Sequence, residues 1–144
     1  MILFERTYQF SSSHLYWRDD WSEERNRATF GKCAIRPAHG HNYRLTIRLR
    51  GKVDPETGFL VDLGELDRMV RERIVGRLDH RHVNEVVPEF APGGKVPTSE
   101  NLAQWIADTL RADPVGRATL HEVRLQEEDR IAAIWQDDLR DSGS

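Results

Sequence analysis

The residues from His39 to Arg50 alternate between two chemical classes. Histidine, tyrosine, leucine and isoleucine fill the odd positions, and glycine, asparagine, threonine and arginine fill the even ones. A period of two is typical of a strand with one face on a core and the other in water, and it does not fit a helix. The chain must therefore build a half-buried sheet, and His39 and His41 share its apolar face.

The first residues of the chain predict a second strand, from Ile2 to about His14. Phe4, Tyr8 and Phe10 fall on even positions, polar residues fill the odd positions 5, 7 and 9, and the face of the aromatic residues extends to His14. The next stretch, residues 15–32, is heavily charged and has no sustained period, so we expect a long loop with one helical turn near residues 21–25. Long loops in small domains usually have a function.

Two helices and a hairpin complete the predicted order. Asp62 and Glu65 form a plausible N-terminal cap for a helix that reaches about Leu78, and a second helix starts at Thr98 or Ser99 and ends before Pro114. Alternating residues after position 122 predict a hairpin with a turn at residues 128–129 or nearby. The order β-β-α-α-β-β is an α+β arrangement with antiparallel strands, in a single domain over residues 1–144 whose tail, 137–144, is frayed.

Composition narrows the class of protein. The 144 residues are 38% hydrophobic and 31% charged with a net charge of −3, which fits a soluble domain and argues against nucleic acid as a partner. No apolar run is long enough to cross a membrane, and Glu5 and Arg6 interrupt any signal-peptide core, so we expect a cytoplasmic protein. The single cysteine excludes an internal disulfide.

Three histidines are candidates for a metal site. His39 and His41 leave one face of a strand, and His14 ends the neighbouring strand on the same inward face. Three neutral imidazoles suit Zn²⁺ and leave a fourth coordination position open, which is the catalytic pattern. The alternative is that they are ordinary strand-end histidines.

Cys33 and the pair Asp79–His80 are candidates for proton transfer. A lone cysteine is usually a small buried hydrophobic residue, but a nearby metal ion or Lys32 favours its thiolate, which is a base or nucleophile. In one interpretation Asp79 orients His80 for proton transfer. In the other, the pair caps the C-terminal end of a helix, where the helix dipole favours a protonated histidine. His82 and His121 have no such partners and are predicted on the surface.

Glu127 interrupts an inward-facing apolar series formed by Val123 and Leu125. A buried carboxylate needs compensation, either from an internal ion pair or from a ligand that offers two adjacent N–H donors. Glu100 lies in the first turn of the second helix, where the helix dipole is a sufficient reason for an acidic residue.

Taken together, the chain resembles the 6-pyruvoyl-tetrahydropterin synthase family, which includes the bacterial 6-carboxytetrahydropterin synthases. The matching segments occur in family order over nearly the whole chain. They are FSSSH (Phe10 to His14), GKC (Gly31 to Cys33), HGHNY (His39 to Tyr43), DPETGFLVDLGEL (Asp54 to Leu66), LDHRHVN (Leu78 to Asn84), PTSEN (Pro97 to Asn101) and the glutamate of LQEED (Leu125 to Asp129).

The resemblance implies a T-fold, in which a four-stranded antiparallel sheet carries two helices on one face. It also implies a homo-oligomer, because family members close such sheets into a trimeric barrel and stack two trimers into a hexamer with sites at subunit interfaces. By position, the resemblance assigns roles as follows. Zn²⁺ is held by His14, His39 and His41, proton transfer falls to Cys33, Asp79 and His80, the pterin is anchored by Glu127, and its pocket is lined by Thr98, Ser99 and Glu100.

The substrate implied by the resemblance is 7,8-dihydroneopterin triphosphate. The pyruvoyl enzymes eliminate triphosphate and leave a pyruvoyl side chain, whereas the carboxy enzymes, which serve queuosine synthesis, cleave the side chain and release acetaldehyde. The long segment from Cys33 to His39 favours the pyruvoyl reaction. Two readings from other classes stay open, a non-catalytic zinc-binding module and a zinc hydrolase that does not need Cys33.

Overall fold

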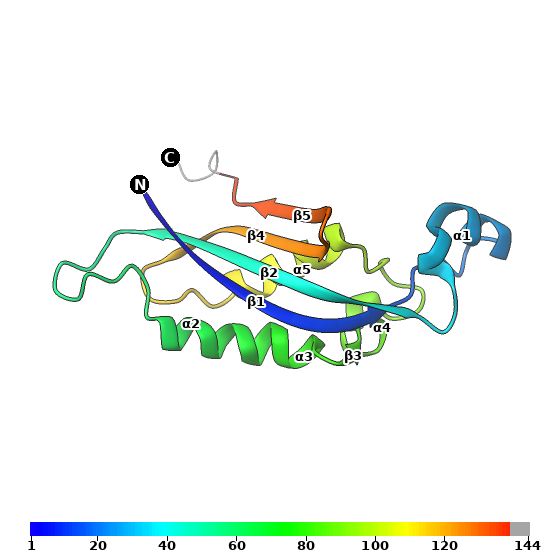
Figure 1. The fold of residues 1–144 in the computed structure, drawn as a ribbon, viewed down its shortest axis with the longest axis horizontal. Helices are drawn as coiled ribbons and strands as arrows, with labels where there is room; N and C mark the ends of the chain where they lie inside the picture. Colours follow the sequence, from blue (N-terminus) through cyan, green and yellow to red (C-terminus); the bar gives the residue numbers. More distant parts are fainter. Residues whose placement is uncertain (139–144) are drawn as a thin grey trace.

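A computed structural model describes residues 1–138, in which one open, five-stranded sheet forms the frame of the molecule (Figure 1). The long strands β1 (Ile2–His14) and β2 (His39–Gly51) pair antiparallel along their whole length. Their register sets Ile2 opposite Gly51 at one end and His14 opposite His39 at the other. Both strands match the prediction, and their pairing brings the candidate metal ligands to one end of the sheet.

The sheet has one strand more than the predicted four. Strand β3 (Arg81–His82) pairs parallel to β1 at the edge, where the Ser12 hydroxyl donates to the Arg81 carbonyl at 2.8 Å. A two-residue strand has no sequence period, so only this tertiary contact defines it. The strand order is β3-β1-β2-β4-β5, and within residues 1–138 the sheet does not close on itself.

The predicted hairpin is confirmed as β4 (Thr119–Glu128) and β5 (Ile131–Gln136), with its turn at residues 129–130. The ladder between them shifts by one residue between Gln126 and Glu128. Glu127 therefore lies at a β-bulge, an irregularity that redirects a side chain and is frequent beside functional sites.

The two predicted helices cover one face of the sheet. Helix α2 (Leu63–Val70) begins after Asp62, whose Oδ1 accepts the Glu65 N–H at 2.9 Å. It continues through a π-helical segment (Arg71–Val75) and α3 (Gly76–Leu78), so the predicted end at Leu78 is confirmed although the π segment was not anticipated. Helix α5 (Ser99–Arg111) is capped by Thr98, and both helices bury their apolar stripes against the sheet in one core.

The charged loop of residues 15–32 is more helical than its sequence predicts. Helix α1 (Glu23–Phe30) is followed by a 3₁₀ turn (Gly31–Ala34), where one turn near residues 21–25 was expected. The Ser22 hydroxyl caps α1, and the buried Asn26 amide donates to the Arg18 carbonyl at 2.9 Å. These contacts explain why α1 was not predicted at its full length. The helix is held by polar hydrogen bonds of Ser22 and Asn26, and a sequence period reveals only helices that bury an apolar stripe. Two short elements, α4 (Val83–Val86) and a 3₁₀ turn (Pro88–Phe90), connect α3 to α5.

Within residues 1–138, no helix combines the length and apolar character that crossing a bilayer requires. Most of the tail predicted to be frayed, residues 139–144, lies outside the described residues.

Candidate metal and catalytic site

Three imidazole rings meet at one end of the sheet, as the sequence predicts. His14 comes from the end of β1, and His39 and His41 come from the start of β2. Their ring centroids form a nearly equilateral triangle with sides of 4.8, 5.0 and 4.9 Å. The His14 side chain is fully buried and the other two are partly exposed, so the cluster opens toward solvent on one side.

Hydrogen bonds on the outer side of the rings turn the Nε2 atoms inward. The Lys32 carbonyl, which can only accept, lies 3.0 Å from Nδ1 of His39, so that nitrogen carries the proton and Nε2 keeps its lone pair. The Tyr43 hydroxyl lies 2.8 Å from Nδ1 of His14 and can accept its proton in the same way. Such outer partners fix the tautomer of metal-binding histidines.

The electrostatics of the cluster keep His14 neutral. Burial, and then the neighbouring His39 and His41, lower the pKa of His14 to about 3. Neutral imidazole is the form that binds a metal ion, so His14 is available as a ligand at any ordinary pH.

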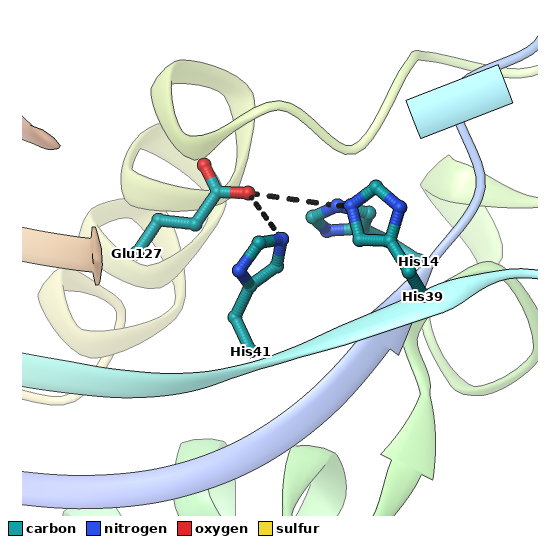
Figure 2. Close-up of side chains that lie close together, drawn as sticks. All are labelled: His14, His39, His41 and Glu127. Carbon is teal, nitrogen blue, oxygen red and sulfur yellow. Dashed lines mark hydrogen bonds and ion pairs between the residues drawn. The ribbon is translucent and has the colours of Figure 1, made fainter. Parts of the chain in front are cut away.

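Glu127 completes the cluster from the bulge in β4. Its Oε1 lies 2.9 Å from His41 Nε2 and 3.5 Å from His14 Nε2, and Figure 2 shows the carboxylate and the three imidazoles pointing toward one another. Among the residues that the structure describes, the buried His41 Nε2 nevertheless has no partner in hydrogen-bonding geometry. One donor atom from each of the four side chains lies within 4.8 Å of the others, and this set of three nitrogens and one oxygen suits a divalent metal ion such as zinc.

Cys33 lies beside the histidines, with its Sγ 3.6 Å from Nε2 of His39. Burial, followed by the charge of Glu127, raises the pKa of the Cys33 thiol. Lys32 is not among the groups that shift this pKa, so its predicted help to the thiolate is not seen. A cation held by the cluster would act in the opposite direction and favour the thiolate.

Asp79 and His80 lie at the β3 edge, where neither makes a described contact with Cys33 or the cluster. Asp79 Oδ1 accepts the Ser11 N–H at 2.9 Å and lies 3.0 Å from Nδ1 of His80. The Ser11 hydrogen bond, and then His80, lower the pKa of Asp79, so the carboxylate is ionised and orients the imidazole. The His80 side chain is 82% exposed, which leaves it free to face another molecule.

The three residues at the start of α5 have different surroundings. Ser99 is buried, and its hydroxyl donates to Oε2 of Glu127 at 2.8 Å. Thr98 uses its Oγ1 to accept the Asn101 N–H and cap the helix. Glu100 is exposed in the first turn.

Some features of the site escaped the sequence analysis. Tyr43 and the Lys32 carbonyl have no predicted role, although Tyr43 lies two residues after the predicted ligand His41 and Lys32 lies next to the predicted base Cys33, and that proximity was the available signal. The Tyr16 ring packs on His14 with centroids 4.5 Å apart. His82 and His121, predicted on the surface, are partly buried, and His82 Nδ1 lies 3.0 Å from the Ser13 hydroxyl.

Comparison with known proteins gives a consistent result. Residues 4–138 match the family described as 6-pyruvoyl tetrahydropterin synthase. The 6-pyruvoyl tetrahydrobiopterin synthases of Pongo abelii and Homo sapiens are 37% and 36% identical over 132 residues, 91% of this chain and 88% of each relative. The solved 6-pyruvoyl tetrahydropterin synthase of Caenorhabditis elegans superposes with a TM-score of 0.87 at 31% identity, over 95% of this chain and 96% of that one.

The fold and the site thus define an α+β protein with a histidine and carboxylate cluster at the end of a helix-covered sheet. The chain belongs to the 6-pyruvoyl tetrahydropterin synthase family.

Proposed function

We propose that the protein is a zinc-dependent lyase that converts 7,8-dihydroneopterin triphosphate to 6-pyruvoyltetrahydropterin with loss of triphosphate. The observation that carries the proposal is the convergence of His14, His39 and His41, with Cys33 next to them, in a chain whose relatives at 33–37% identity are named pyruvoyl synthases. The names of these relatives favour the pyruvoyl reaction over the carboxy reaction.

In this proposal the three histidines hold the ion, which acts as a Lewis acid on the hydroxyl-bearing side chain of the substrate. The Cys33 thiolate removes a proton from that side chain, and His80, held by Asp79, exchanges another. Glu127 accepts N–H groups of the pterin ring, with Ser99 fixing one of its oxygens. Thr98 and Glu100 frame this end of the pocket from the start of α5.

The separation of the two proton-transfer groups supports an oligomer. Cys33 lies beside the cluster and Asp79–His80 at the β3 edge, and in this proposal a second chain brings one unit of each kind to the same substrate. Strand β5 forms the other edge of the sheet, and pairing between edges of neighbouring copies would remove two exposed backbone edges. We propose a trimer or a dimer of trimers, which light scattering on the purified protein would test.

Incubation with 7,8-dihydroneopterin triphosphate, followed by mass analysis of the pterin, tests the function. We expect 6-pyruvoyltetrahydropterin and free triphosphate. Acetaldehyde with 6-carboxytetrahydropterin would show the carboxy reaction of the queuosine pathway instead. Zinc binding with no consumption of substrate would favour a non-catalytic module.

A further inference from the structure

The position that a three-histidine site would leave open is filled here by a side chain of the protein. Glu127 projects Oε1 between His14 and His41 (Figure 2). The bulge in β4 aims it there, since regular pairing with β5 is broken at this residue. The second oxygen, Oε2, is held by the buried Ser99 hydroxyl at 2.8 Å, so the carboxylate is fixed at both ends.

Three of the distances within the cluster are close to those of a four-ligand site. Ligand atoms at roughly 2.0–2.1 Å from zinc in tetrahedral geometry lie about 3.3 Å from one another. The observed separations are 3.1 Å between His14 Nε2 and His39 Nε2, 2.9 Å between His41 Nε2 and Glu127 Oε1, and 3.5 Å between His14 Nε2 and Glu127 Oε1.

Hydrogen bonding does not explain this approach. Oε1 is 2.9 Å from His41 Nε2, yet that buried nitrogen has no partner in hydrogen-bonding geometry within the described part of the chain. The Lys32 carbonyl requires the proton on Nδ1 of His39, so His39 Nε2 keeps a lone pair and lies 3.1 Å from His14 Nε2 and 3.6 Å from Cys33 Sγ. Three imidazole nitrogens and one carboxylate oxygen that converge on one point are what a cation requires.

We propose that Glu127 is the fourth ligand of the metal ion in the substrate-free protein, so that the resting site is closed with three imidazoles and one carboxylate. This role precedes the pterin-anchoring role given to Glu127 above. One carboxylate then serves two partners in turn, and pterin binding competes with the ligand role of Glu127. The competition rests on the proposed function, whereas the coordination itself does not.

Coordination is tested on the full-length protein loaded with zinc and free of pterin. In a crystal structure we expect a Glu127 oxygen at roughly 2.0–2.2 Å from the ion. In competition with a zinc chelator, Glu127→Gln should bind zinc about tenfold or more weakly, and Glu128→Gln, which alters the adjacent exposed carboxylate, should bind as the wild type does. Zinc on the three histidines with the Glu127 carboxylate out of bonding contact would overturn the proposal.

Linkage tests the competition. Unsubstituted pterin, which has no side-chain hydroxyls, should raise the zinc dissociation constant of the wild type and leave that of Glu127→Gln unchanged, because binding effects of two ligands are reciprocal. An unchanged constant in the wild type at saturating pterin would show that the two roles are independent and would refute the exchange. Failure of pterin to bind would instead contradict the synthase function, and the crystal structure would still decide the coordination.

Discussion

The hydroxyl oxygen of Tyr43 lies 2.8 Å from Nδ1 of His14, and both side chains are almost completely buried. The two residues lie 29 positions apart and meet because β1 and β2 pair in a register that sets Phe10 opposite Tyr43. This contact directs Nε2 of His14 toward His39, His41 and Glu127 and links the core of the sheet to the candidate metal site.

Tyr43→Phe should weaken zinc binding about tenfold or more while leaving the fold intact, because the outer partner of His14 is lost and the ring packing is kept. The phenyl ring can still stack on Phe10, whose centroid lies 5.0 Å from that of Tyr43. Chelator competition measures the change. Tyr8→Phe is the matched control, since its hydroxyl contacts Asp67 away from the site, and an equal loss in both variants would refute the specific role.

Cys33→Ala should retain full zinc content and lose turnover by about 10²–10⁴-fold, as expected when a general base is removed. The thiol lies 3.6 Å from His39 Nε2, so it is close to the candidate metal site without belonging to its four candidate ligands. Elemental analysis and a turnover assay are run on the same sample. Unchanged turnover would exclude the thiol base and favour a hydrolase that uses the metal alone.

His80→Asn should lower turnover by about 10²–10⁴-fold without a change in thermal unfolding. Asparagine is chosen because His80 has a φ of 59°, a left-handed conformation that asparagine tolerates. Glu85→Gln, at a nearby exposed residue, is the control. If His80→Asn were as active as that control, the imidazole would have no part in proton transfer.

Asp67→Asn should destabilise the protein by about 1–2 kcal/mol at neutral pH, because Asp67 ties α2 to β1. Its carboxylate accepts two hydrogen bonds from Arg6, at 3.0 and 2.9 Å, and one from the Tyr8 hydroxyl at 2.6 Å. Urea unfolding at pH 7 measures the difference, and Glu65→Gln, on the exposed side of the same helix, is the control. Equal stability of the two variants would show that the tie is not stabilising.

The same carboxylate predicts a pH dependence of stability. The Arg6 hydrogen bond, and to a smaller extent Tyr8, lower the pKa of Asp67 below its value of about 3.9 in the unfolded chain. A lowered pKa in the folded state stabilises the fold fully above pH 3.9, and this contribution is lost as the pH falls through the folded pKa. The stability difference between wild type and Asp67→Asn should therefore shrink below pH 4, and a constant difference down to pH 2 would contradict the assignment.

The sequence alone determined the long strands, both main helices and the terminal hairpin, because periods of two and of 3.6 follow directly from which face is buried. It also placed His14, His39 and His41 together, since alternation sets which side chains share a face. Strand β3 and helix α1 were not predictable in this way. Strand β3 is held by its pairing with β1 and the Ser12 hydrogen bond, and α1 by the Ser22 cap and the Asn26 amide, and such polar contacts leave no periodic trace.

The tertiary structure decided what surrounds the three histidines. The bulge at Glu127 depends on how β4 pairs with β5, and it places the carboxylate of this predicted pterin anchor next to His14 and His41. Register likewise set the Tyr43 hydroxyl against His14. Residue types and spacing specify which side chains share a face, but the distances that define a coordination site arise only when three strands are aligned.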